Sequence, residues 1–272
     1  MSLASAGPLL LVGCGKMGGA LLRGWLGQGL PPAAVSVVEP SAAAAREFAD
    51  AGVEWSDTAP PAAPPPRVVV LAVKPQSMAA ALPACRAFVG PATLFLSIAA
   101  GKTIAHLERR LGAEAAIVRS MPNTPAAIGR GITVACANGT VTDEQRALST
   151  ALLGAVGEVA WVGDESLLDP VTALSGGGPA YVFLLVECLA EAGRRAGLPA
   201  DLAMRLARAT VAGSGELMRR TDEPVATLRQ HVTSPRGTTL EALKILMAPE
   251  GLQPLLTRAI AAATRRSREL AD

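Results

Sequence analysis

The chain has 272 residues and a formal net charge of +2 at pH 7; half of its residues are apolar and only 3% are aromatic. A chain of this length can fold without disulfides or metal ions, and it has room for two domains. Its 25 basic and 23 acidic residues are interspersed, so no long basic face is expected and nucleic acid is a poor candidate partner. The composition favours a helix-rich α/β protein that acts on a small molecule.

The cysteines do not form a disulfide or metal-binding pattern. They lie far apart among apolar neighbours, without a C-x-x-C pair, at Cys14, Cys85, Cys136 and Cys188. Such thiols are typical of a reduced cytoplasmic protein, and with two histidines in the sequence we expect no metal site. The apolar run 181–186 stops at Glu187, short of the roughly 20 residues that cross a bilayer, and no signal-like segment opens the chain. We expect a cytoplasmic protein without a membrane partner.

The first 163 residues alternate short β-branched runs with longer Ala-rich segments, the pattern of βαβ units around a parallel sheet. Strands are predicted at residues 9–12, 35–38, 68–73, 93–98, 116–119, 132–135 and 158–162. Helices are predicted at residues 17–27, 41–51, 76–88, 103–111 and 142–153. Five prolines in the run 60–66 predict a stiff connector, because proline disrupts helix and strand alike.

The strand signal vanishes after residue 163. Amphipathic helices separated by Gly and Pro are predicted at residues 166–174, 179–196, 200–219, 238–247 and 252–270. The sequence therefore predicts two domains, an α/β domain over residues 1–163 and an all-helical domain over residues 164–272.

A glycine-rich turn joins the first predicted strand to the first predicted helix. It reads Gly13-Cys14-Gly15-Lys16-Met17-Gly18, a G-x-G-x-x-G sequence in the context of a Rossmann-type dinucleotide-binding domain. In that motif Gly13 permits the tight turn, Gly15 lets the backbone approach a pyrophosphate, and Gly18 lets helix and strand pack closely. The helix N-terminus supplies N–H donors to the anion. A merely structural glycine turn is the alternative.

Glu39 ends the second predicted strand, 21 positions after Gly18. That is close to the spacing at which an acid hydrogen-bonds the adenosine ribose. A carboxylate there should repel the 2′-phosphate of NADPH, so the sequence leans towards NADH, although Arg46 is near enough to accommodate NADPH. The alternative is that Glu39 is an exposed residue leading into a helix cap at Ser41.

Three further strand ends carry candidate ligand-binding residues, because open α/β sheets bind ligands at the carboxyl ends of their strands. In Ala72-Val73-Lys74-Pro75, the lysine faces the cofactor or substrate, or else is a solvated surface residue. The small residues of Ala99-Ala100-Gly101 leave room for the nicotinamide side of a dinucleotide. The run Met121-Pro122-Asn123-Thr124-Pro125 predicts a rigid loop.

Two clusters of small and hydroxyl-bearing residues lie at predicted helix starts in the second domain. They are Ser175-Gly176-Gly177-Gly178 and Ser234-Pro235-Arg236-Gly237-Thr238-Thr239. Backbone N–H groups at a helix start can hold a substrate carboxylate. Ordinary N-capping by Ser and Thr is the alternative.

The order of these motifs resembles the pyrroline-5-carboxylate reductase family, over essentially the whole chain. The shared motifs are G-x-G-x-M, A-V-K-P-Q, S-I-A-A-G, M-P-N-T-P-A, S-G-x-G-P-A-Y and V-T-S-P-x-G-T-T. The resemblance implies a Rossmann-type N-terminal domain and an all-helical C-terminal dimerisation domain that forms a homodimer or a higher oligomer built from it. It also implies hydride transfer from NADPH or NADH to 1-pyrroline-5-carboxylate, which yields L-proline.

The motifs and the strand ends together give the candidate site residues. Those expected to bind the cofactor are Gly13, Cys14, Gly15, Lys16, Met17, Gly18, Glu39, Ala72, Val73, Lys74, Pro75, Ala99, Ala100, Gly101 and Asn123. Those expected to bind the imino acid are Ser175, Gly176, Gly177, Gly178, Ser234, Arg236, Gly237, Thr238 and Thr239. Thr239, which the resemblance places near the ring nitrogen, and Lys74 are the candidate catalytic residues.

Two positions depart from the family pattern. Gly177 stands where the family usually has Ser, and Arg236 stands where it usually has a small residue, commonly Gly. Arg236 can grip a carboxylate, crowd the pocket or point to solvent. Two other functions therefore stay open: a related reductase for another imine or a β-hydroxy acid, with Lys74 as acid–base group, and a cofactor-binding regulatory protein with weakened turnover.

Overall fold

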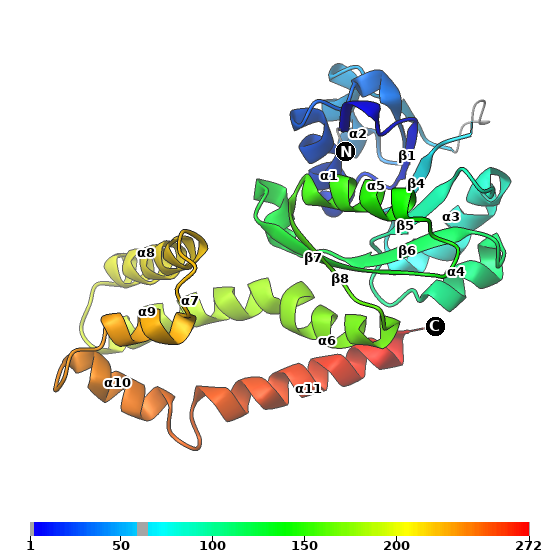
Figure 1. The fold of residues 1–272 in the computed structure, drawn as a ribbon. Helices are drawn as coiled ribbons and strands as arrows, with labels where there is room; N and C mark the ends of the chain where they lie inside the picture. The colour runs from blue at the N-terminus through cyan, green and yellow to red at the C-terminus, as the bar shows by residue number, and fades with distance from the viewer. Residues whose placement is uncertain (1–2, 59–64, 272) are drawn as a thin grey trace. The chain divides into compact units, whose positions relative to one another are not determined.

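The computed structural model describes residues 3–58 and 65–271; residues 60–64 of the predicted proline connector lie outside the described residues. The chain divides into two compact units (Figure 1). The first comprises Met1–Gly176 and Ala263–Asp272, and the second comprises Gly177–Ala262.

The first unit is built on one eight-stranded sheet, with strand order β3-β2-β1-β4-β5-β6-β7-β8. The strands are β1 (Leu9–Val12), β2 (Val35–Val38), β3 (Glu54–Ser56), β4 (Val68–Leu71), β5 (Leu94–Ser97), β6 (Ala116–Met121), β7 (Gly131–Ala137) and β8 (Gly157–Trp161). The neighbouring strands are parallel apart from β6 and β7, which pair antiparallel. The predicted α/β fold is confirmed, and the expectation of a purely parallel sheet is corrected at β7.

The parallel strands in the middle of the sheet end level with one another. One row of paired residues crosses β2, β1, β4, β5 and β6 as Val38, Val12, Leu71, Ser97 and Arg119. The segments that follow this row therefore leave the sheet at one edge, which we call the carboxyl edge. Open α/β sheets bind their ligands there.

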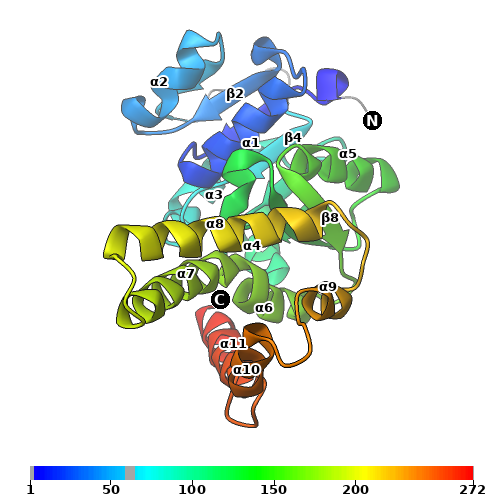
Figure 2. The same ribbon diagram turned by 90° about the vertical axis from the view of Figure 1, so that its left-hand side faces the viewer.

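Helices cover both faces of the sheet (Figures 1 and 2). On one face lie α1 (Lys16–Gly27), α2 (Ala42–Asp50) and α5 (Asp143–Gly154); on the other lie α3 (Met78–Cys85), α4 (Ile104–Leu111) and α6 (Leu168–Val171). Alternate strand residues serve the two faces: Leu9 and Leu11 pack in the first core, Leu10 and Val12 in the second. Because both faces are buried, the strands are continuous apolar runs, which is why they could be predicted.

Several elements differ from the prediction. Strand β3 was not predicted, because Glu54-Trp55-Ser56 contains no apolar run. Strands β6 and β7 are longer than predicted, since their antiparallel pairing extends β6 to Met121 and β7 to Ala137. The predicted helix 166–174 is instead a 3-10 turn, η6 (Glu165–Leu167), the short helix α6 and a π-helical turn, η7 (Thr172–Gly176).

The compact units differ from the predicted division at residue 163. Helix α6 belongs with the sheet because Leu168 is fully buried in the second core. The end of α11 (Leu252–Leu270) also belongs there, since Ser267 Oγ donates a hydrogen bond to Asp169 Oδ1 at 2.6 Å. The segment that leads into the glycine cluster 175–178 is therefore fixed on the sheet.

The second unit contains α7 (Gly178–Arg195), α8 (Ala200–Arg219), α9 (Val225–His231), α10 (Thr238–Leu246) and the first part of α11. Helix α9 was not predicted. Helices α7 and α8 lie side by side (Figure 2), and small residues on them are buried: Ala190, Ala203 and Ala207.

Large apolar side chains stay exposed along the helices of the second unit. They include Phe183, Leu184, Leu206, Leu217, Ile245, Leu246, Met247 and Leu255. The stretch Glu165–Arg195, which includes α7, is long and apolar enough to cross a membrane by length and composition alone. That is weak evidence for a span, because an exposed apolar surface of this kind is also what a protein interface presents.

Candidate active site

The glycine turn between β1 and α1 has a different constraint at each glycine. Gly13 has φ +96°, and a Cβ there would lie 2.8 Å from the carbonyl carbon of Ala72. A Cβ at Gly18 would collide with the carbonyl oxygen of Gly13. At Gly15, by contrast, a Cβ would meet nothing within 4 Å. Gly13 and Gly18 are thus required by the fold, whereas Gly15 opens onto free space.

That free space adjoins the N-terminus of α1. Gly15 is the N-cap of this helix and has no side chain that could bond its first N–H groups. Those groups are available to an anion, and the helix dipole favours negative charge at this end. An open position beside unused N–H donors fits the pyrophosphate of a dinucleotide.

The Glu39 carboxylate lies against the glycine turn. Its Oε2 accepts a hydrogen bond from the Cys14 N–H at 2.8 Å, and its Oε1 accepts one from the Ser41 N–H at 3.0 Å. If Glu39 only led into a helix cap at Ser41, the hydrogen bond from the Ser41 N–H would be explained but the one from the Cys14 N–H would not. The first bond fixes a negative charge beside the turn, where the ribose of a bound dinucleotide would lie.

The Cys14 thiol has low reactivity, although the residue lies in the glycine turn. Burial, followed by the charge of Glu39, raises the pKa of its thiol from 9.0 to about 11. The thiolate is the reactive form of cysteine, so the thiol stays protonated at neutral pH. Cys14 therefore contributes its backbone N–H rather than its sulfur.

The loops after β4 and β5 continue the sheet's hydrogen bonding. The Ala72 N–H donates to the Val12 carbonyl at 2.8 Å, and the Ile98 N–H donates to the Leu71 carbonyl at 3.1 Å. The Ala99 N–H then donates to Ser97 Oγ within the same loop, at 3.3 Å. Gly101 has φ +72°, and a Cβ there would lie 3.0 Å from the carbonyl oxygen of Leu270.

Lys74 is exposed just before a 3-10 turn, η3 (Pro75–Ser77). A catalytic role for Lys74 stays a prediction.

Asn123 connects the loop after β6 to the π-helical turn η7. Its Oδ1 accepts a hydrogen bond from the Ile132 N–H at 3.0 Å, and its Nδ2 donates to Ser175 Oγ at 3.2 Å. The structure thus brings Ser175 and Gly176, two predicted substrate residues, beside a predicted cofactor residue. Single π-helical turns are frequent at functional sites.

The remaining predicted substrate residues belong to the second unit. Gly177 and Gly178 begin α7, and the 234–239 segment forms a turn into α10 in which the Gly237 N–H donates to the Ser234 carbonyl at 3.1 Å. Thr239 is exposed on the first turn of α10.

Arg236 is exposed and has φ 59°, the left-handed region that glycine adopts most easily. This conformation explains why the family usually has a small residue, commonly Gly, at the position.

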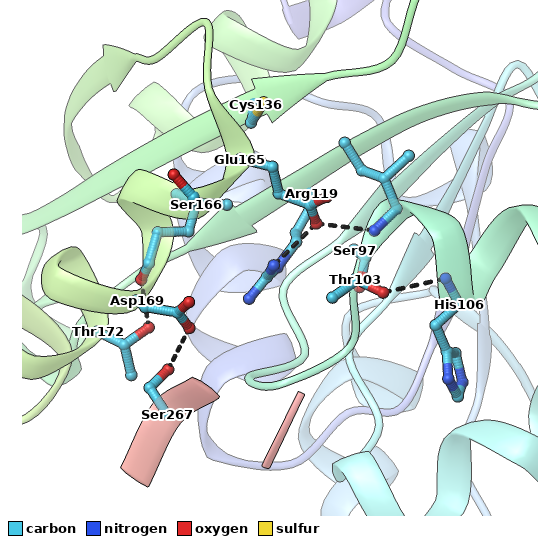
Figure 3. Close-up of polar contacts among 12 residues, drawn as sticks. Ser97, Thr103, His106, Arg119, Cys136, Glu165, Ser166, Asp169, Thr172 and Ser267 are labelled. Atoms are coloured by element: carbon cyan, nitrogen blue, oxygen red, sulfur yellow. Dashed lines mark hydrogen bonds and ion pairs between the residues drawn. The ribbon is translucent and has the colours of Figure 1, made fainter. Parts of the chain in front are cut away.

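Sequence reasoning missed an ion pair behind the carboxyl edge. Arg119 Nη1 donates to Glu165 Oε1 at 2.8 Å, and the same oxygen accepts a bond from the Ile104 N–H at 2.8 Å (Figure 3). The two side chains are 46 positions apart, so no local pattern links them. Only knowledge of the strand order could have suggested the contact.

A cavity of about 500 Å³ adjoins the loops after β4 and β5 and was also missed. Its lining includes Gly101 and Lys102, which precede α4, together with His106 and Arg110, which are four residues apart and so lie on one side of α4. The four-residue spacing of His106 and Arg110 could have indicated that these two side chains share one side of a helix. Within the described residues, no group of three or more His, Cys, Asp or Glu side chains is placed to hold a metal ion.

Comparison with known proteins decides the family. Residues 165–270 match the pyrroline-5-carboxylate reductase dimerisation family, and residues 9–101 match the family described as NADP oxidoreductase coenzyme F420-dependent. The chain is 38% identical over 265 residues to the pyrroline-5-carboxylate reductase of Pseudomonas aeruginosa, a match that covers 97% of each chain. The chain belongs to the pyrroline-5-carboxylate reductase family.

Other members of the pyrroline-5-carboxylate reductase family agree in sequence and structure. The enzyme of Synechocystis sp. is 43% identical over 203 residues, which cover 75% of this chain and 74% of that one. A solved pyrroline-5-carboxylate reductase from Coxiella burnetii has a TM-score of 0.92 at 35% identity, over 98% of this chain and 100% of that one. The Plasmodium falciparum reductase, solved with NADP bound, has a TM-score of 0.81 at 29% identity, over 97% and 98% of the two chains.

Substitution of Gly15 and Gly18 separates cofactor binding from folding. Gly15→Ala should change the free energy of unfolding by less than about 0.5 kcal/mol, because its Cβ meets open space. It should nevertheless weaken NAD(P)H binding about tenfold or more by occupying the space that the pyrophosphate approaches. Gly18→Ala should cost about 1–3 kcal/mol of stability through overpacking. Urea unfolding and cofactor fluorescence titration measure the two effects; unchanged affinity in Gly15→Ala would contradict the assignment.

Proposed function

We propose that this chain reduces 1-pyrroline-5-carboxylate to L-proline, the final step of proline biosynthesis, with NADPH or NADH as hydride donor. Membership of the pyrroline-5-carboxylate reductase family is the observation that carries the proposal. The glycine turn supports it, because its open position beside the α1 N-terminus fits a dinucleotide. The bound cofactor supplies a hydride from C4 of its nicotinamide.

The reaction needs orientation more than acid–base machinery. A protonated cyclic imine is already a strong electrophile, so the protein's task is to hold the imine carbon against the hydride donor and to tolerate the iminium charge. The small residues of 99–101 leave space for the nicotinamide end of the cofactor. A 2-hydroxy-acid dehydrogenase would instead need a base on the alcohol.

The substrate contacts are assigned from the two clusters of small and hydroxyl-bearing residues. Gly177 and Gly178 lie at the start of α7, directly after Ser175 and Gly176 of the π-helical turn η7, and backbone N–H groups at this helix start are suited to the substrate carboxylate. Thr239, near the start of α10, offers a hydroxyl that hydrogen-bonds the ring nitrogen. Ser175 Oγ accepts a hydrogen bond from Asn123 Nδ2, so the protein itself fixes the position of this hydroxyl.

Steady-state oxidation of NADH and NADPH with 1-pyrroline-5-carboxylate as acceptor tests the function. We expect turnover with proline as product, and we expect Thr239→Ala to lower kcat/KM for the imine about tenfold or more, since one hydrogen bond to a charged group is lost. Thr257→Ala, an exposed hydroxyl on α11, is the matched control and should retain full activity. Full kcat/KM in Thr239→Ala would contradict the role of that residue.

The same assay distinguishes the two other functions that the departures at Gly177 and Arg236 leave open. Activity on β-hydroxy acids in place of the imine would indicate a related reductase. Tight cofactor binding with no oxidation by any acceptor would indicate a regulatory protein.

Within this function we propose that Glu39 favours NADH. Its carboxylate is fixed by the Cys14 and Ser41 N–H groups, so it cannot easily turn away from a 2′-phosphate. Like charges in such proximity repel each other. Arg46 is exposed on α2 and is the cation that could offset the repulsion.

Glu39→Gln should raise the ratio of kcat/KM for NADPH to that for NADH about tenfold, equivalent to about 1.4 kcal/mol. The amide keeps the shape and an acceptor oxygen but removes the charge. Glu47→Gln is the control, because Glu47 lies on α2 and pairs with Arg23 on the protein surface. An unchanged ratio in Glu39→Gln, or an equal rise in Glu47→Gln, would contradict this role of Glu39.

We further propose that the chain is a cytoplasmic homodimer. The match of residues 165–270 to the dimerisation family and the exposed apolar side chains of the second unit support a second copy of this chain as the partner. Light scattering should give at least twice the chain mass of 27.7 kDa, and a monomer would contradict the proposal. The free thiols Cys14, Cys85 and Cys136 are buried and unpaired with one another, which supports a reducing compartment.

A further inference from the structure

We propose that Arg119 and Glu165 are positioning residues for hydride transfer. Their ion pair fixes the position of the 99–101 loop, at the carboxyl edge, relative to the π-helical turn η7. The proposal rests on the proposed function, because its kinetic consequence is measured in imine reduction.

The pair is shielded from water on one side. The side chain of Arg119 is 6% exposed and that of Glu165 is 27% exposed, and the Nη1 to Oε1 distance is 2.8 Å. Arg119 lies in the last row of parallel pairing, directly opposite Ser97 at the end of β5. The sheet therefore fixes the backbone from which the Arg119 side chain reaches Glu165. The carboxylate of Glu165 is in turn held by the guanidinium, since a buried cation left without its partner is costly.

Glu165 also bonds the beginning of α4. Its Oε1 accepts the N–H of Ile104, the first residue of that helix, at 2.8 Å. The first N–H groups of a helix have no partner within the helix, and a negative charge near them is favourable. Thr103 caps the next part of the same turn by accepting the His106 N–H at 3.1 Å (Figure 3). The start of α4 is thus fixed to Glu165, which lies on another part of the chain.

The loop between β5 and α4 is held at both ends as a result. At its start the Ala99 N–H donates to Ser97 Oγ, and beside it Ser120 Oγ donates to the Ser97 carbonyl at 3.0 Å. At its end the Ile104 N–H bonds Glu165. The residues between these anchors include Ala100 and Gly101, which are expected to contact the nicotinamide side of the cofactor. Loss of the Glu165 contact removes the anchor at Ile104, where this loop enters α4.

Glu165 also begins the segment that leads to the substrate residues. It opens the 3-10 turn η6, which continues directly into α6 and then into η7 with Ser175. Asp169 of α6 accepts a bond from Ser267, and Thr172 Oγ1 donates to the Leu168 carbonyl at 2.7 Å. Together with the Ser120–Ser97 and Asn123–Ser175 hydrogen bonds, the ion pair therefore links β6, the cofactor loop and the substrate-binding segment. Small misplacements of reacting groups lower hydride transfer steeply.

The experiment compares Glu165→Ala and Glu165→Gln with wild type in three measurements. We expect Glu165→Ala to lower kcat about tenfold or more while the Kd of reduced cofactor changes less than about threefold, because the glycine turn is untouched. Glu165→Gln should restore kcat to within about threefold of wild type, since its amide oxygen can accept from both Arg119 and Ile104. Amide hydrogen exchange of the 99–107 segment should accelerate in Glu165→Ala only.

Glu144→Ala is the matched control. Glu144 pairs with Arg67, which precedes β4 at the opposite edge of the same sheet, and its loss should leave kcat and exchange at 99–107 unchanged. If Glu165→Ala does not fold, Glu165→Asp replaces it, because a side chain one methylene shorter cannot reach both donors; the same fall in kcat is expected.

The outcomes distinguish this proposal from the proposed function. If the wild-type protein does not reduce the imine, the proposed function is overturned. Amide exchange would still show whether Glu165 holds the 99–107 segment. The positioning role would be overturned if the wild-type protein reduces the imine and a folded Glu165→Ala or Glu165→Asp variant keeps full kcat and unchanged amide exchange at 99–107. A fall in kcat in Glu165→Ala without faster exchange at 99–107 would overturn it too, because the loop would then be held without the Glu165 contact.

Discussion

The turn between β1 and α1 has no room for a side chain at Gly13 or Gly18, and the geometry of this part of the carboxyl edge depends on that close approach. A Cβ at Gly13 would press on the backbone of Ala72, and one at Gly18 would collide with Gly13 itself. Helix α1 therefore enters directly against the ends of β1 and β4. As a result its free N–H groups and the Glu39 carboxylate lie beside one another, and the position of both is set by backbone packing.

The two halves of the carboxyl edge are held together by different interactions. On the side of β1 and β2, close backbone contacts and the Glu39 hydrogen bonds fix the glycine turn. On the side of β5 and β6, where the small residues 99–101 lie, side-chain hydrogen bonds fix the loops. Asn123 bonds Ile132 and Ser175, and Glu165 joins Arg119 to the start of α4. Side-chain contacts are specific but are lost with a single substitution. We therefore expect variation among related reductases to be tolerated less at these polar contacts than at neighbouring surface positions.

The sequence was sufficient for the elements with a strong local signal. The buried strands are apolar runs, and the glycine turn is a motif with a known context, so both could be predicted to within a few residues. Strand β3 was missed because Glu54-Trp55-Ser56 is short and half polar, and the antiparallel pairing of β7 depends on strand order rather than on local composition. Of the site, the strand-end residues could be placed on one edge, but the Arg119–Glu165 pair could not, since its partners are brought together only by the fold. The roles of Lys74 and Thr239 stay predictions.

The fate of the transferred hydride is the most direct measure of the function derived for this chain. A reduced cofactor carrying two deuterium atoms at C4 of the nicotinamide, so that transfer from either face delivers deuterium, is incubated with the protein and 1-pyrroline-5-carboxylate, and the proline is analysed by mass spectrometry and NMR. Direct transfer predicts one deuterium on the ring carbon that was the imine carbon, with one cofactor oxidised for each proline formed. Proline without deuterium at that carbon, or cofactor oxidation without proline, would contradict the assignment.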